Sequence, residues 1–134
     1  MIILRCCLAM SIALIIGCAS YGERKQMDML EQRTGNYETA LRWGRYELAR
    51  AFIKSKGTDQ VKDNLDGLKQ IKITSYKLLG RNFLENKEEA EQKVEIRFYN
   101  MDNLIERTII DHQTWIFNYD LENWFLSSGL PDFK

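Results

Sequence analysis

Apolar and polar positions follow a helical period from residue 27 to residue 52. Apolar or small side chains recur there in steps of three or four, at Met27, Leu30, Thr34, Tyr37, Leu41, Gly44, Leu48 and Phe52. Such steps place side chains on one face of an α-helix. Glycine costs about 1 kcal/mol relative to alanine inside a helix. We therefore expect a break near Gly35 or Gly44 and not one straight rod.

The period changes in the middle of the chain. Residues 57–67, "GTDQVKDNLDG", lie between glycines and predict a short helix capped by Thr58 or Asp59. Residues 68–79, "LKQIKITSYKLL", are rich in β-branched side chains and predict a strand. The charged run 85–93, "ENKEEAEQK", is interpreted as the solvated connection to the next strand.

Strand patterns continue to the C-terminus. Val94, Ile96 and Phe98 alternate with polar residues and predict a strand with one buried face. A tight turn at 101–103, a long strand over 104–119 and a turn at 120–123 lead into a last short strand. In the "SSGLPDF" ending, Leu130 and Phe133 are expected to pack against the domain. Helices followed by an antiparallel meander predict an α+β fold.

The first 17 residues have the layout of a secretory signal. Arg5 is followed by eleven largely apolar residues and then by Gly17. A transmembrane helix needs about 20 apolar residues, and the polar sequence "SYGERK" begins too early for that. The pattern predicts a signal peptide over residues 1–17.

The sequence Ile15-Ile16-Gly17-Cys18 resembles a bacterial lipobox. The resemblance implies cleavage between Gly17 and Cys18, with a diacylglycerol on the Cys18 thiol and usually an N-acyl chain. Ala19 stands where aspartate often signals inner-membrane retention. The resemblance therefore implies a cell-envelope protein, lipid-anchored in the outer membrane and facing the periplasm, if the source is Gram-negative.

Cysteine usage favours the same interpretation over ordinary cleavage or an uncleaved anchor. Cleavage before Cys18 removes 17 of the 134 residues, and with them Cys6 and Cys7. The remaining 117 residues hold one thiol, which cannot form an intramolecular disulfide. Lipidation explains a lone thiol in an exported protein. Several acyl chains anchor a protein stably, whereas one does so only marginally.

The predicted mature chain forms one folded unit. Residues 18–26 form a short polar tether, and residues 27–134 form a single α+β domain of ordinary size. The whole chain has 19 basic and 19 acidic residues, and loss of Arg5 leaves a formal charge of −1. This balance gives no reason to expect a nucleic-acid partner or a surface that selects anionic lipid.

The domain resembles the cystatin-like or nuclear transport factor 2-like fold. The resemblance rests on a helix, glycine break and helix in residues 37–53, on residues 65–79, and on the closing hairpin in residues 114–133. It implies N-terminal helices packed on a curved antiparallel sheet of about four strands. Enzymes of that fold include isomerases and dehydratases with an aspartate, a tyrosine or a His/Asp pair in the cone between sheet and helices.

Aromatic side chains are the first candidates for ligand or partner contacts. Trp115, Phe117 and Tyr119 are spaced by two, so on a strand they leave the same face, and Trp124 follows across a turn. They would form either an aromatic wall for an apolar ligand or, as we favour, core beneath the helices. Trp43 and Tyr46 flank Gly44 and are expected to fall off the buried helical stripe, which makes them better ligand candidates.

Catalytic and metal chemistry find little support in the sequence. His112 is the only histidine and follows Asp111 directly. Adjacent strand residues point to opposite faces, so these two side chains form no dyad unless a bulge intervenes. One histidine and a lipidated cysteine leave no ligand cluster for a metal. The sequence contains no phosphate-binding loop and predicts no cofactor.

The sequence favours a lipid-anchored, non-enzymatic envelope protein that binds a protein partner or an apolar ligand. An isomerase or dehydratase using the cone and a structural subunit of an envelope complex are the alternatives. A cone lined by buried carboxylates would favour the enzyme. An exposed apolar patch on the sheet would favour a protein partner.

Overall fold

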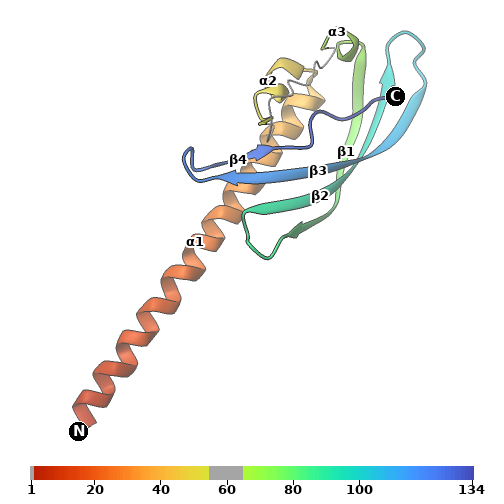
Figure 1. The fold of residues 1–134 in the computed structure, drawn as a ribbon. Coiled ribbons are helices and arrows are strands. Elements are labelled where there is room, and N and C mark those ends of the chain that lie inside the picture. The colour runs from red at the N-terminus through yellow and green to blue at the C-terminus, as the bar shows by residue number, and fades with distance from the viewer. Residues whose placement is uncertain (1, 55–64) are drawn as a thin grey trace.

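The computed structural model describes residues 2–54 and 65–134, with side chains described from Tyr21 onward. Its elements are α1 (Ile2–Arg42), α2 (Tyr46–Arg50), α3 (Leu65–Leu68), β1 (Ile71–Phe83), β2 (Glu89–Asn100), β3 (Glu106–Asn118) and β4 (Asn123–Leu126). The strands form one antiparallel sheet in the order β1-β2-β3-β4. The helices pack against this curved sheet (Figure 1), and the predicted α+β fold is confirmed.

Helix α1 ends where the sequence predicted a break, at Gly44. The Gly44 φ of 65° lies in the left-handed region, which favours glycine. The Gly44 amide donates to the Leu41 carbonyl at 3.0 Å, and the Arg45 amide donates to the Ala40 carbonyl at 2.8 Å. This pair of bonds is a Schellman motif. The other candidate, Gly35, lies inside α1 without interrupting it.

The predicted tether is helical and partly docked on the domain. Helix α1 runs through residues 18–26 without a break. Glu23 forms an ion pair with Lys87 of the β1–β2 turn, and the Gln26 carbonyl accepts a hydrogen bond of 3.0 Å from Trp124 Nε1. Contacts with the sheet therefore begin at about residue 23, four residues before the predicted domain boundary.

Most of the short helix predicted over residues 57–67 lies outside the described residues. The described part, α3, ends at Leu68, beyond Gly67. Strand β1 then begins three residues later than predicted and extends four residues further. Only residues 84–88 connect β1 to β2, so the interpretation of residues 89–93 as a solvated connection is wrong.

The core lies between α1 and one face of the sheet. Rows of side chains cross that face, and the row formed by Phe83, Ala90 and Trp115 packs beneath α1. The Trp115 and Tyr37 rings meet edge to face with centroids 5.5 Å apart. Val94, Ile96 and Phe98 are buried as predicted. Two bulges, at residues 73–75 and 78–80, interrupt the β1 register.

The outer edge of β4 is covered by the segment after α2. Leu126 donates its amide to the Phe52 carbonyl at 2.9 Å and accepts from the Lys54 amide at 3.0 Å. Ile53 forms a parallel bridge with Leu126. Among the described residues, no strand pairs with the outer edge of β1. Phe133 lies against Phe98, with ring centroids 4.9 Å apart, and Leu130 also packs on the core, as predicted.

The β2–β3 turn differs in one detail from the sequence prediction. The turn was expected at 101–103 with a strand from residue 104, but Leu104 has a positive φ of 56° and β3 begins at Glu106. The side chains of Asn100 and Asn103 accept hydrogen bonds from backbone amides two residues later. These Asx-type bonds fix the turn.

Candidate functional site

Three of the four aromatic residues that could have formed a ligand wall lie in the packed core, the interpretation favoured from the sequence. Trp115 and Trp124 have no exposed surface, and Phe117 is buried. The Phe117 and Trp124 rings meet edge to face, with ring centroids 5.3 Å apart. Tyr119 lies beyond the end of β3, is 58% exposed and meets Phe117 edge to face, with ring centroids 5.0 Å apart. Of these four residues, only Tyr119 presents substantial surface to a ligand.

The two candidates beside Gly44 have opposite environments. Trp43 is 74% exposed, as expected, whereas Tyr46 is 3% exposed and donates its hydroxyl to the Ile71 carbonyl at 3.2 Å. Burial raises the Tyr46 pKa to about 12. The expectation that Tyr46 falls off the buried face is therefore wrong, and Leu48, counted on the buried stripe, is half-exposed. The turn at Gly44 changes the direction of the chain, so the spacing of α1 does not continue into α2.

A network of polar side chains crosses the inner face of the sheet. Gln113 is 1% exposed, and its Oε1 accepts from Gln92 Nε2 at 2.6 Å and from Trp115 Nε1 at 3.2 Å. Its Nε2 donates to the Asp111 carboxylate at 2.8 Å and to the Tyr76 hydroxyl at 3.0 Å. Trp115 can only donate, so the orientation of the Gln113 amide is fixed by its partners.

Burial shapes the chemistry of two groups in this network. Burial raises the pKa of the Asp111 carboxyl, against the opposing effects of the Gln113 hydrogen bond and of nearby His112. Burial also raises the pKa of the Tyr76 hydroxyl, and the bond from Gln113 opposes the shift. A carboxyl whose pKa is raised by burial, beside a phenol, is a candidate for proton exchange with a ligand.

Arg81 links the network to helix α1. Its Nε donates to Gln92 Oε1 at 2.9 Å, and its Nη2 donates to the Thr34 hydroxyl at 2.9 Å. Thr34 in turn donates to the Glu31 carbonyl at 3.1 Å. Burial lowers the Arg81 pKa, while the negative charge of Glu31 opposes this shift. The two groups that accept hydrogen bonds from the Arg81 guanidinium, the Gln92 side-chain carbonyl and the Thr34 hydroxyl, are both neutral.

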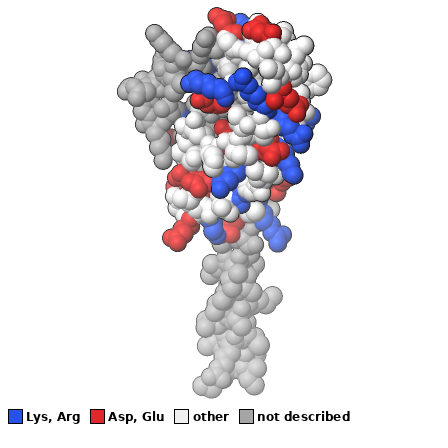
Figure 2. Space-filling view, turned by 90° about the vertical axis from the view of Figure 1, so that its right-hand side faces the viewer, with Lys and Arg blue, Asp and Glu red and all other residues white. Residues whose placement is uncertain are grey.

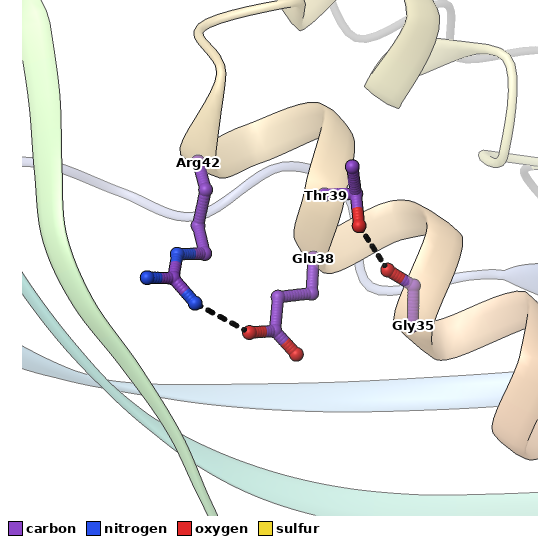
Figure 3. Close-up of polar contacts among 4 residues, drawn as sticks. All are labelled: Gly35, Glu38, Thr39 and Arg42. Carbon is purple, nitrogen blue, oxygen red and sulfur yellow. Dashed lines mark hydrogen bonds and ion pairs between the residues drawn. The ribbon is translucent and has the colours of Figure 1, made fainter.

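A groove of about 230 Å³ lies between α1 and β1 beside this network. Its lining consists of Glu31, Thr34, Gly35 and Glu38 from α1, Tyr76, Leu78 and Arg81 from β1, and Gln92 from β2. Figure 3 shows Glu38 and Arg42 leaving the same side of α1, joined by an ion pair of 3.3 Å. Next to this pair, the Thr39 hydroxyl donates to the Gly35 carbonyl at 2.9 Å. Leu78 is 46% exposed, so the groove offers both apolar surface and fixed polar groups.

Asp111 and His112 face opposite sides of the sheet, as the alternation predicted. Asp111 pairs in register with buried Val94, whereas His112 is exposed on the outer face. His112 lines a second hollow of about 360 Å³ there, together with charged Glu91 and Lys93. The two side chains therefore form no catalytic dyad.

Surface charge and metal-binding groups add no further site. On the face drawn in Figure 2, basic and acidic side chains are interleaved. Within the described residues, no group of three or more histidine, cysteine, aspartate or glutamate side chains could hold a metal ion. No helix in the part of the chain with described side chains combines the length and hydrophobicity needed to cross a membrane.

The raised Asp111 pKa predicts a pH-dependent difference between the wild type and Asp111→Asn. A carboxyl with a raised pKa in the folded state favours folding below its unfolded pKa, and this contribution is lost as pH rises through the folded value. The asparagine side chain keeps an acceptor for Gln113 without a buried charge. We expect Asp111→Asn to be more stable than the wild type at pH 7, with the difference shrinking toward pH 4. Urea unfolding midpoints across this range measure it, and a pH-independent difference would contradict the assignment.

Sequence reasoning missed the polar network, although its signal was present. Two-residue alternation from Val94 leads back to Gln92, and alternation from Trp115 leads back to Gln113. Both glutamines therefore belong to the inward face.

Comparison of the chain with models of known protein families, with curated proteins and with solved structures gave no match.

Proposed function

We propose that this protein is a lipid-anchored component of the bacterial cell envelope that binds a partner protein or an apolar ligand in the groove between α1 and β1. The groove carries the binding part of the proposal. It sets half-exposed Leu78 beside the ordered side chains of Tyr76, Arg81 and Gln92. Ligand sites combine apolar surface with a few fixed polar groups in this way.

The anchor rests on the leader and its single following cysteine. A short apolar stretch ending at Gly17 and Cys18 fits signal cleavage and lipid attachment, with outer-membrane placement favoured by Ala19. Helix α1 leads from this segment to the domain and places the groove on its later turns. Lipid on Cys18 would thereby hold the domain near the membrane.

The anchor predicts complete dependence of acylation on Cys18. A clickable fatty acid fed to expressing cells should label the wild type and should not label Cys18→Ala. Cys6→Ala serves as the matched control and should retain the label, because Cys6 lies in the predicted signal peptide. Equal labelling of the wild type and Cys18→Ala would refute lipid attachment at this thiol.

Site-specific photocrosslinking in intact cells tests the binding groove. A photoreactive amino acid at Leu78 should capture a partner, because this side chain lines the groove. The same amino acid at Ile110 is a matched control, since Ile110 is 45% exposed and lies on the outer face of the same sheet. Crosslinks from residue 110 but not from residue 78 would show that the partner binds the outer face of the sheet and not the groove.

One observation favours a proton-transfer enzyme as a second candidate. The Asp111 carboxyl and the Tyr76 hydroxyl share Gln113 as a hydrogen-bond donor, and both have raised pKa values. Such an enzyme would lose turnover in Asp111→Asn while keeping its fold. A binding protein would keep its crosslinks from residue 78 in the same variant, and this difference separates the two candidates.

A further inference from the structure

Exposed apolar side chains gather where α1 leaves the domain toward its N-terminus. Between 39% and 74% of each side chain is exposed. We call this group the basal cluster; its members are Tyr21 and Met27 of α1, Leu84 of the β1–β2 turn, and Tyr119 and Leu121 of the β3–β4 turn. Both turns flank α1 at this end of the domain (Figure 1).

Polar contacts join the helix and the two turns into one surface. Lys87 of the β1–β2 turn forms an ion pair with Glu23 of α1. The Tyr119 hydroxyl donates to the Glu88 carboxylate at 3.1 Å, and the Phe117 amide donates to the Glu88 carbonyl at 2.8 Å. A hollow of about 140 Å³, lined in part by Met27 and Phe83, lies between α1 and the β1–β2 turn. The basal cluster is therefore a fixed feature of the domain.

The position of Cys18 identifies what faces this surface. At a rise of about 1.5 Å per residue, helix α1 places Tyr21 about 4 to 5 Å and Met27 about 14 Å beyond Cys18 along its axis. The polar layer on each side of a bilayer is about 5 to 8 Å thick. Lipid on Cys18 would thus hold the basal cluster at or just above the headgroups.

The chemistry of the basal cluster suits a lipid interface. Tyrosine is enriched at membrane–water interfaces because its ring is apolar and its hydroxyl is polar. Charged residues of both signs stand next to the cluster in sequence: Arg24, Lys25 and Lys87 are basic, while Glu85, Glu88, Asp120 and Glu122 are acidic. Apolar insertion and not attraction to anionic lipid therefore drives the contact.

We infer that the basal cluster docks on the lipid surface to which Cys18 anchors the chain, which orients the domain on the membrane. This inference rests on the proposed lipid anchor. A covalent anchor makes the second contact intramolecular, so a modest apolar contact suffices to hold it. The partner surface that we infer is a zwitterionic bilayer.

A fluorescent probe on single cysteines tests the orientation. The full chain is expressed in cells, purified in detergent and reconstituted in phosphatidylcholine vesicles containing brominated phosphatidylcholine. Labelling is specific because the predicted mature chain has no cysteine except lipidated Cys18. An environment-sensitive probe goes on Leu121→Cys or Leu84→Cys. The matched control is Leu104→Cys, an exposed turn position at the opposite end of the sheet.

Docking predicts a blue shift and loss of probe emission by bromine quenching at residues 84 and 121, with neither at residue 104. Added sodium chloride should leave both effects unchanged. Equal quenching at residues 104 and 121, or none at residue 121, in protein that still floats with the vesicles would overturn the docking and leave the anchor intact. A blue shift without quenching that grows with protein density would assign the cluster to a second copy instead. Failure of the protein to float with the vesicles would overturn both the lipid anchor and the docking of the basal cluster.

Discussion

Replacing Trp115 with alanine is expected to lower the free energy of unfolding by about 3 to 5 kcal/mol. The Trp115 side chain has no exposed surface and packs edge to face on Tyr37. Its indole N–H also donates to Gln113, so truncation removes a buried hydrogen bond together with the packing. Urea unfolding followed by circular dichroism measures the change.

Trp43→Ala is the matched control for this prediction. Trp43 is 74% exposed, so its truncation should change the free energy of unfolding by no more than about 0.5 kcal/mol. Trp43 would belong to the core if its truncation were as costly as that of Trp115.

Gln113→Leu is expected to lower the free energy of unfolding by about 3 kcal/mol, because leucine has nearly the same size but leaves Gln92 Nε2 and Trp115 Nε1 without their acceptor. Each buried polar group left unsatisfied costs about 1 to 3 kcal/mol. Exposed Gln32→Leu on α1 controls for the substitution itself and should have little effect. A loss below about 1 kcal/mol for Gln113→Leu would show that the network contributes little to stability.

Gln113→Glu distinguishes the role of Gln113 as a donor to Asp111 and Tyr76 from its role as an acceptor for Gln92 and Trp115. The glutamate keeps acceptor oxygens for Gln92 and Trp115 but brings a negative charge next to Asp111. Burial and the neighbouring carboxylate should raise its pKa in the folded state. The variant should therefore regain stability as pH falls through that raised value. Recovery at acidic pH distinguishes a charge effect from general damage to the core.

The sheet was predictable because its signals are local. Alternation at Val94, Ile96 and Phe98 and the two-residue spacing of Trp115 and Phe117 identify the buried face directly. The break was predicted near Gly35 or Gly44 from the cost of glycine inside a helix, but this cost alone does not tell the two apart, and α1 continues through Gly35.

The site was less predictable because it depends on contacts between distant segments. Alternation from Val94 assigns Gln92 to the inward face, but its hydrogen bonds to Arg81 and Gln113 depend on how β1, β2 and β3 pair. Tyr46 is buried because the chain changes direction after Gly44. A helical period counted straight through Gly44 ignores that change and so places Tyr46 on the wrong face. The groove could not be predicted either, because its width depends on the distance between α1 and β1, and the periodicity of the sequence carries no information on that distance.

The long separation between α1 and its partners in β4 sets the order in which the chain can fold. Trp124 donates to the Gln26 carbonyl, and its own carbonyl accepts from Arg33, across 98 and 91 positions of sequence. During synthesis, the apolar face of α1 has no completed partner surface until β4 has left the ribosome. Such non-local contacts form slowly. If residues 1–17 act as the signal peptide we propose, this late closure would keep the chain unfolded, and able to pass through a membrane channel, until export is complete.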